Sequence, residues 1–223
     1  MGKIRDLAED VLSSDVKDAL IGAGIVVVDG LADVSDRIAG QMKKQSGNKG
    51  NKLYDKFDKY AKKSDYDHCL LVINSKDTGA YVFVEPGGGI KYVGKHVDSS
   101  REIFLYDFDE DIIGLVSPVE LHKKGFLSKK LESLKEQIVI NGYVVASVEY
   151  SPGDEGTFKL NTDYWKLWLK MSDKNVSVKD DFSISGKKKD FKGAHILEFN
   201  DPVKEILLAL MLIAITELKK GIE

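Results

Sequence analysis

The sequence predicts a mainly β protein, α+β overall, in which a closed antiparallel barrel of about twelve strands encloses a hydrophobic C-terminal helix. Apolar residues recur every three or four positions before residue 64, as in helices, and mostly at every second position after it, as in strands. A run of ten apolar residues, 206–215, lies close to the end of the chain. We therefore expect N-terminal helices in 1–63 and the barrel with its central helix in 64–223.

Length and composition are those of one folded domain with an appendage. The 223 residues are 43% hydrophobic and 31% charged, which excludes collagen-like, disulfide-dense and wholly disordered chains. The net charge of −3 gives the molecule as a whole no attraction to nucleic acid. A single cysteine, Cys69, excludes an internal disulfide and a thiolate-rich metal site. The first residues lack a basic and then apolar signal, so we expect a cytoplasmic protein, with peripheral membrane attachment as an option.

Helical patterns and a connector occupy the first 63 residues. Apolar periodicity favours helices over 4–12 and 16–42, although 25–28 suits a strand equally well. The polar, glycine-containing stretch 46–52 is typical of a flexible connector. A short amphipathic helix is expected next. Its apolar side consists of Leu53, Phe57 and Tyr60.

From residue 64, strand patterns alternate with turn residues. Asn141-Gly142 is the strongest hairpin signal, because both residues tolerate the positive φ of a type I′ turn. Asp77-Thr78-Gly79 indicates another hairpin, which Pro86 to Gly89 ends. The lysine-rich segment 121–136 is less regular. The expected strands are 70–74, 81–84, 90–97, 103–108, 112–116, 138–140, 143–145, 158–160, 165–171, 176–178, 182–185 and 196–199.

The run 206–215 decides the architecture. Asn200 or Asp201 can cap a helix here, and Pro202 fits its first turn. A membrane-spanning helix needs roughly 20 apolar residues, so this run is too short. Because it is apolar on every side, protein must enclose it on all faces. A closed barrel does so and also removes open strand edges. A layered α+β fold, with this helix between the sheet and the N-terminal helices, is the competing architecture.

Three segments carry a family resemblance. Residues 103–116 have the pattern of a strand, an acidic turn and a strand ending in Ile-Gly-x-Val. Residues 140–148 are similar to an INGxxVAxI hairpin, and 196–215 have the pattern of a strand followed by a hydrophobic helix. Together they resemble the LURP-one-related family, in the tubby C-terminal-like superfamily that includes the phospholipid scramblases. The resemblance spans about 89–215 and implies a twelve-stranded barrel threaded by the C-terminal helix. The first 63 residues match nothing in the family.

The resemblance also bears on function. Tubby-like members imply phosphoinositide binding through basic residues on the barrel, but no specific ligand residue aligns with this sequence. Scramblases carry a cysteine-rich palmitoylation segment, and this chain has one cysteine, so scrambling activity is not implied.

Other chemically suggestive residues have simpler structural interpretations. Gly87 to Gly89 lack the following Lys-Ser/Thr and helix of a phosphate loop and predict a turn. The alternating acids that begin at Asp107 lack the glycine and glutamate of a calcium loop and predict a solvated turn. Cys69 is expected in the core, with His68 pointing to the opposite face. No histidine pair has the spacing of a helical zinc site; the histidines are His68, His96, His122 and His195.

Two basic features point to a binding surface. Alternation predicts Trp168 outside the barrel between two lysines, which suits a membrane interface or a partner protein. Cover by an N-terminal helix or by lysine stems is the alternative interpretation. The run 187–192 is the densest in lysine and could contact anionic headgroups, or form an ordinary charged turn. The candidate phospholipid- or anion-binding residues are Lys187, Lys188, Lys189, Lys192 and Trp168.

Two functions follow as hypotheses. The first is a non-catalytic binding or scaffold module, contacting an anionic phospholipid membrane or a protein partner, the latter through the N-terminal helices. No metal or cofactor is expected. The second is an enzyme or small-ligand carrier with a pocket at one end of the barrel, which would need a polar cavity holding two histidines, or a histidine with carboxylates.

Overall fold

The computed structural model describes residues 50–74, 79–97, 100–123, 131–151, 157–170, 175–185, 191 and 194–220. The predicted helices over 4–12 and 16–42, and the basic run Lys187, Lys188, Lys189 and Lys192, lie outside these residues.

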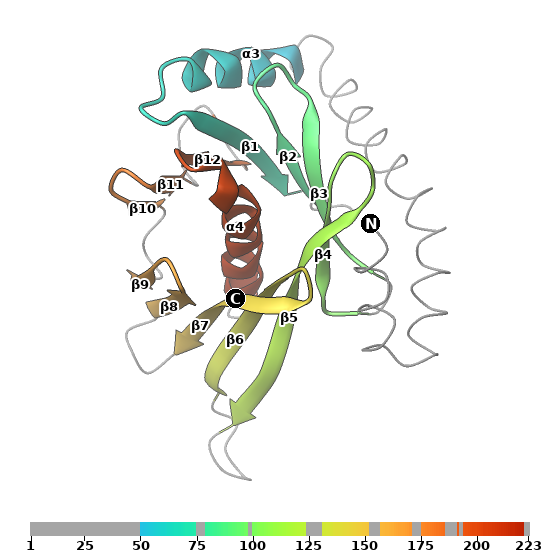
Figure 1. Ribbon diagram of the computed structural model, residues 1–223, viewed down its shortest axis with the longest axis vertical. Coiled ribbons are helices and arrows are strands. Elements are labelled where there is room, and N and C mark those ends of the chain that lie inside the picture. The colour runs from blue at the N-terminus through green and yellow to red at the C-terminus, as the bar shows by residue number, and fades with distance from the viewer. Residues whose placement is uncertain are drawn as a thin grey trace.

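Twelve strands form one sheet that curls around a central helix (Figure 1). The strand order is β10-β11-β12-β1-β2-β3-β4-β5-β6-β7-β8-β9, and every neighbouring pair is antiparallel. The mainly β prediction and the strand number are confirmed. The strands are β1 (His68–Asn74), β2 (Tyr81–Val84), β3 (Ile90–His96), β4 (Ile103–Tyr106), β5 (Ile112–Lys123), β6 (Leu131–Ile140), β7 (Tyr143–Ser151), β8 (Thr157–Thr162), β9 (Lys166–Lys170), β10 (Asn175–Val178), β11 (Phe182–Ser185) and β12 (Ala194–Phe199).

The predicted antiparallel barrel is confirmed, and it is nearly closed. Pairing of β1 with β12 joins the first strand to the last, but within the described residues no ladder links β9 to β10. A side chain joins this junction instead. The Trp165 indole Nε1 donates a hydrogen bond of 2.8 Å to Asp181, and its ring meets the Phe182 ring edge-on at 4.8 Å. Side-chain packing therefore takes the place of backbone pairing between these strands.

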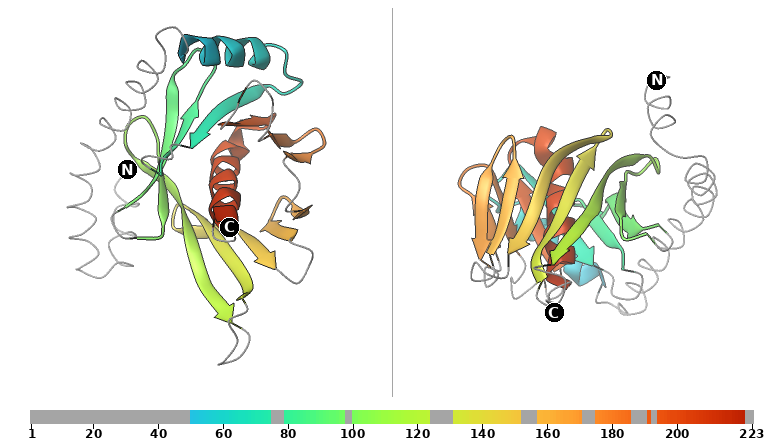
Figure 2. Two further views of the ribbon diagram at one scale, coloured as in Figure 1. Left: turned by 180° about the vertical axis from the view of Figure 1, so that it is seen from behind. Right: turned by 90° about the horizontal axis from the view of Figure 1, so that it is seen from below.

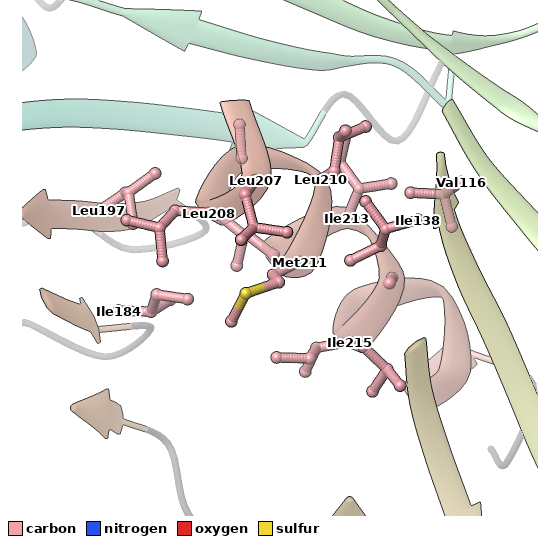
Figure 3. Packing of buried hydrophobic residues seen from close by; sticks show 14 of the residues in the cluster. Val116, Ile138, Ile184, Leu197, Leu207, Leu208, Leu210, Met211, Ile213 and Ile215 are labelled. Atoms are coloured by element: carbon pink, nitrogen blue, oxygen red, sulfur yellow. The ribbon is translucent and has the colours of Figure 1, made fainter. Parts of the chain in front are cut away.

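The C-terminal helix α4 (Glu205–Lys220) runs through the barrel, as predicted. Every residue from Leu207 to Ile215 is buried. Figure 3 shows why all faces are apolar: Leu208 points toward Leu197 on one wall, and Ile213 points toward Ile138 on another. The helix is thus enclosed by strands rather than layered against one sheet. At roughly 1.5–3 kcal/mol for each fully buried Leu, Ile or Met, its burial is the largest local hydrophobic contribution.

Local signals fix where α4 begins. The Asp201 carboxylate accepts a hydrogen bond from the Val203 amide, as an N-cap does, and Pro202 opens a short 3₁₀ helix, η1 (Pro202–Lys204). Glu205 then starts the α-helix, and its carboxylate lies 2.8 Å from the Lys91 ammonium on β3. The predicted cap and proline are confirmed, with a 3₁₀ turn between them and α4.

Two glycines let α4 approach the wall. A Cβ atom built on Gly114 of β5 would lie 2.7 Å from the Leu210 Cδ1 atom and 3.0 Å from the Val139 carbonyl oxygen. A Cβ atom on Gly94 of β3 would lie 2.9 Å from Ile213 Cδ1. The helix and the strands therefore meet closely where the wall carries no side chain.

Helix α3 (Gly50–Ala61) docks on the outside of the barrel (Figure 2). Phe57 is fully buried in a second apolar cluster against β1, β2 and β12, which confirms the predicted amphipathic helix. The helix begins at Gly50, so the last three residues of the predicted connector 46–52 are helical; docking of the apolar side extends the helix through a glycine with low intrinsic propensity. The Tyr60 and Ser64 hydroxyls donate to the buried Glu198 carboxylate at 2.8 and 2.6 Å.

The hairpin of β5 and β6 is the largest departure from the predicted strands. Both ends of the lysine-rich segment 121–136, predicted to be less regular, belong to these two strands: 121–123 to β5 and 131–136 to β6. Pairs such as His122 with Ser133 continue the ladder. Backbone pairing across the hairpin, rather than the pattern of apolar side chains, extends these strands. By contrast, Asn141 and Gly142 have the positive φ values of 53° and 77° that their sequence predicted.

The antiparallel order places alternate connections at opposite ends of the barrel. We call the end where α4 begins the N rim and the end where it finishes the C rim. The connections of the N rim are 62–67, 85–89, 107–111, 141–142, 163–165, 179–181 and 200–204.

Candidate functional site

The predicted surface around Trp168 is present on the outer face of β8 and β9. In β9, Leu169 is buried and Leu167 half-buried, while Trp168 between them is 62% exposed. Strand alternation causes this pattern, as the sequence predicted. Lys166 and Lys170 flank the indole on the same outer face and are exposed.

A lysine that the sequence reading missed belongs to this surface. Lys159 of β8 pairs directly with Trp168 in the ladder, and its ammonium lies 5.4 Å from the centroid of the indole ring. Such a cation–π contact is worth about 0.5–1 kcal/mol at an exposed site. The lysine that packs on Trp168 is therefore Lys159. Most of the indole ring remains exposed even with this contact. Only the strand register reveals this neighbour, which is nine positions away in the sequence.

The remaining predicted binding residues are not brought to this surface by the described part of the chain. Lys187, Lys188, Lys189 and Lys192 fall between β11 and β12 in the sequence, outside the described residues. The helix that is described, α3, packs on β1, β2 and β12 rather than on β9. The described site thus consists of Trp168 with Lys159, Lys166 and Lys170, which we call the Trp168 surface.

A second polar group lies at the C rim, and sequence reasoning missed it. Glu217 in the last turn of α4 accepts hydrogen bonds from the Tyr81 hydroxyl at 2.5 Å and the Lys220 ammonium at 2.6 Å. The His96 Nε2 atom lies 4.0 Å from its other oxygen. These residues come from β2, β3 and α4, so only the folded barrel brings them together.

Two titratable groups near the C rim are perturbed. Burial raises the pKa of Glu136 on β6 to about 7; the charge of Arg101 opposes this rise and that of Glu217 adds to it. Burial also lowers the pKa of His195 on β12, with the charge of Lys219 acting in the same direction. A carboxyl group with a pKa near 7 can exchange a proton close to neutral pH, which is the property of a general acid or base.

The other candidates have structural roles. Cys69 is buried beneath α3 with its sulfur 3.9 Å from Glu198, and burial raises the pKa of the thiol, which disfavours the reactive thiolate. His68 is exposed and stacks on the Phe199 ring at 5.2 Å. The two neighbours therefore diverge, as predicted.

Both loops with ligand-like sequences are turns. Gly87 and Gly88 have φ values of 96° and 88°, and the Gly87 amide donates to the Asp58 carboxylate of α3 at 2.7 Å. The Asp107 carboxylate accepts from the amides of Asp109 and Asp111 at 3.0 and 2.9 Å. Over the described ranges, no group of three His, Cys, Asp or Glu residues is arranged to hold a metal ion. In the same residues no helix is long and apolar enough to cross a membrane.

Comparison with known proteins adds little. No protein-family model matches the chain, and no curated protein matches it. Among solved structures, the chain is similar to a protein of Arabidopsis thaliana determined by X-ray crystallography, with 9% identity and a TM-score of 0.34. The similarity covers 67% of this chain and 91% of that one.

Proposed function

We propose that the protein is a non-catalytic binding module, a tubby-like barrel of the LURP-one-related type, that associates with anionic phospholipid surfaces through the Trp168 surface. The observation that carries the proposal is the 62% exposed Trp168 among Lys159, Lys166 and Lys170 on one face of β8 and β9. The family assignment rests on the sequence resemblance alone.

The filled interior supports an outer binding surface. Residues Leu207–Ile215 of α4 are buried against the walls, and two strands carry glycine where the helix touches them. A ligand inside the barrel would have to displace this helix, which makes up much of the main core. Because the interior is filled, a barrel of this kind must bind its partner on its outer surface.

The chemistry of the Trp168 surface fits an anionic interface. Tryptophan is enriched at the level of lipid headgroups, where its ring is partly apolar and its N–H can remain hydrated. A lysine near an anionic surface contributes about 1 kcal/mol. We include Lys187, Lys188, Lys189 and Lys192 in the proposed contact on the strength of the sequence alone. A protein partner recruited through the N-terminal helices is the other form of the same hypothesis.

Cosedimentation of the full chain with vesicles tests the proposal. We expect binding to phosphatidylcholine vesicles that contain phosphatidylserine and little binding to phosphatidylcholine alone. Lys159→Ala and Lys166→Ala should each weaken binding about fivefold, from about 1 kcal/mol per lysine, and Trp168→Ala should weaken it as well. Tyr143→Ala is the matched control, because Tyr143 is 69% exposed but lies on the N rim. Equal, negligible binding to both vesicles would remove the membrane form of the hypothesis.

A small-ligand carrier or enzyme acting at the C rim is the second candidate. The cluster of Tyr81, His96 and Glu217, with Glu136 close enough to feel the charge of Glu217, favours it, because this is a histidine with carboxylates at one barrel end. The buried α4 argues against a deep pocket there. A thermal-shift screen of small cations and amines would support this candidate if hits were lost in His96→Asn and Glu136→Gln.

A further inference from the structure

The N rim concentrates exposed apolar side chains. Within the described residues, seven large apolar side chains are exposed, and every one except Trp168 lies in or beside an N-rim connection. Turns of soluble proteins are usually polar, so this grouping is unusual. The N-rim apolar residues, with exposed fractions, are Phe108 (82%), Ile112 (51%), Tyr143 (69%), Val144 (57%), Tyr164 (58%) and Val203 (82%).

These side chains gather on neighbouring turns of one rim, and we call them the N-rim patch. Their turns join β4 to β5, β6 to β7 and β8 to β9, which are consecutive in the sheet, and neighbouring strands lie only about 5 Å apart. Val144 and Tyr164 each lie two residues beyond the last ladder pair of β7 with β8, which places both at the N-rim end of these neighbouring strands. The Lys204 ammonium, 5.1 Å from the centroid of the Tyr164 ring, connects this turn to η1 and Val203.

Negative charge surrounds the patch. The lysines of the N-rim connections are Lys62, Lys63, Lys179 and Lys204, Lys166 lies beside one, and Lys204 lies 3.5 Å from the Asp201 carboxylate. Phe108 itself stands between Asp107 and Asp109. Carboxylates outnumber the lysines; they are Asp65, Asp67, Glu85, Asp107, Asp109, Glu110, Asp111, Asp163, Asp180, Asp181 and Asp201.

This charge determines what the patch can bind. An anionic membrane would be repelled by the carboxylates, so the N rim is not a second phospholipid contact. A second copy of the same rim would bring like charges together at a two-fold axis. A partner surface that carries both apolar side chains and positive charge is complementary to the rim. Its apolar side chains would cover the aromatic rings, and its cations would pair with the surrounding carboxylates.

We propose that the N rim is a docking surface for a basic amphipathic helical segment of a partner protein. Such a segment presents apolar residues at every third or fourth position and lysine or arginine between them, which matches an apolar patch with an acidic border. This inference goes beyond the proposed phospholipid contact, because it concerns the acidic N rim and not the basic Trp168 surface. The exposed rings would serve as the anchors of the interface, since aromatic residues commonly dominate binding.

Fluorescence anisotropy with a designed probe tests the docking surface in the full chain. The probe is a labelled 18-residue helix of leucine and lysine; its counterpart replaces every lysine with glutamate. We expect saturable binding of the lysine peptide that weakens with salt, and no binding of the glutamate peptide. The double variant Phe108→Ser/Tyr143→Ser should weaken binding about tenfold or more, and Asp109→Asn/Asp111→Asn should also weaken it.

Controls separate this proposal from the phospholipid contact. Trp168→Ser removes an aromatic ring of similar exposure from the outer face of β9 and should leave binding of the lysine peptide unchanged. The altered side chains are exposed, so unchanged circular dichroism should show that each variant folds. Equal binding of both peptides, binding that survives the Phe108/Tyr143 double variant, or absence of binding would overturn the proposal. Binding to uncharged vesicles that is lost in this double variant would replace it with a membrane contact.

Discussion

Replacing Gly114 with alanine probes the contact between α4 and the barrel wall. The added methyl group would lie 2.7 Å from Leu210 Cδ1 and 3.0 Å from the Val139 carbonyl oxygen, both shorter than normal contacts. The leucine methyl can turn away, but the backbone oxygen belongs to the β5–β6 ladder and can move little. Overpacking of this kind costs about 1–3 kcal/mol. We therefore expect Gly114→Ala to lower the free energy of unfolding by that amount.

The same contact predicts coupling between positions 114 and 210. Leu210 is fully buried, so Leu210→Ala alone should cost about 2–5 kcal/mol through lost burial and a cavity. In the double variant the alanine methyl at 114 enters space vacated by the leucine. The combined loss should therefore be smaller than the sum of the single losses by about 0.5–3 kcal/mol.

Urea unfolding followed by circular dichroism measures these free energies. Gly89→Ala is the matched control, because a Cβ atom there would meet only the Glu85 carboxylate, at 3.9 Å. That change should be neutral or stabilising by up to about 1 kcal/mol, since alanine restricts the unfolded chain. If Gly114→Ala behaved like Gly89→Ala, or if the losses at 114 and 210 added within about 0.5 kcal/mol, the close approach of α4 to β5 would be refuted.

Two further predictions concern α3 and the C rim. Phe57→Ala should release α3 from β1, β2 and β12 and so increase the rate at which Cys69 reacts with a thiol reagent. Lys59→Ala, which changes an exposed residue of the same helix, should leave that rate unchanged. An unchanged rate in Phe57→Ala would contradict the docking of α3. Because burial raises the pKa of Glu136 to about 7 in the folded protein, the folded state binds a proton more tightly than the unfolded state. The stabilisation from this carboxyl group is therefore present below its ordinary pKa and is lost as pH rises through about 7. The urea midpoint of the native protein should fall between pH 5 and 8 by more than that of Glu136→Gln, and identical pH profiles would show that Glu136 is not perturbed.

The features of the fold that could be predicted are those determined by residues close together in the sequence. The run 206–215 could be satisfied only by enclosure, and Asn141-Gly142 could adopt positive φ at little cost, so both predictions are confirmed. The extent of β5 and β6 was missed because a ladder between strands, and not side-chain periodicity, extends them. The junction of β9 with β10 depends on Trp165 meeting Asp181 and Phe182, which no local pattern indicates.

The candidate site divides in the same way. Alternation within β9 was enough to predict an outward Trp168. Its contact with Lys159 required the β8–β9 register, and the cluster around Glu217 required the last turn of α4 to lie against Tyr81 of β2 and His96 of β3. The apolar patch of the N rim emerges from strand order, because its residues belong to separate turns that only the sheet brings together.

Amide hydrogen exchange of α4 tests most directly whether the barrel encloses this helix. If it does, the amides of Leu208 to Ile215 can exchange only when the whole barrel unfolds, so their opening free energies should equal the global free energy of unfolding, typically about 5–15 kcal/mol. The same amides should respond to urea with the slope of global unfolding. Exchange of these amides at much lower free energy, while the strands stay protected, would show that α4 leaves the barrel independently and would contradict the account.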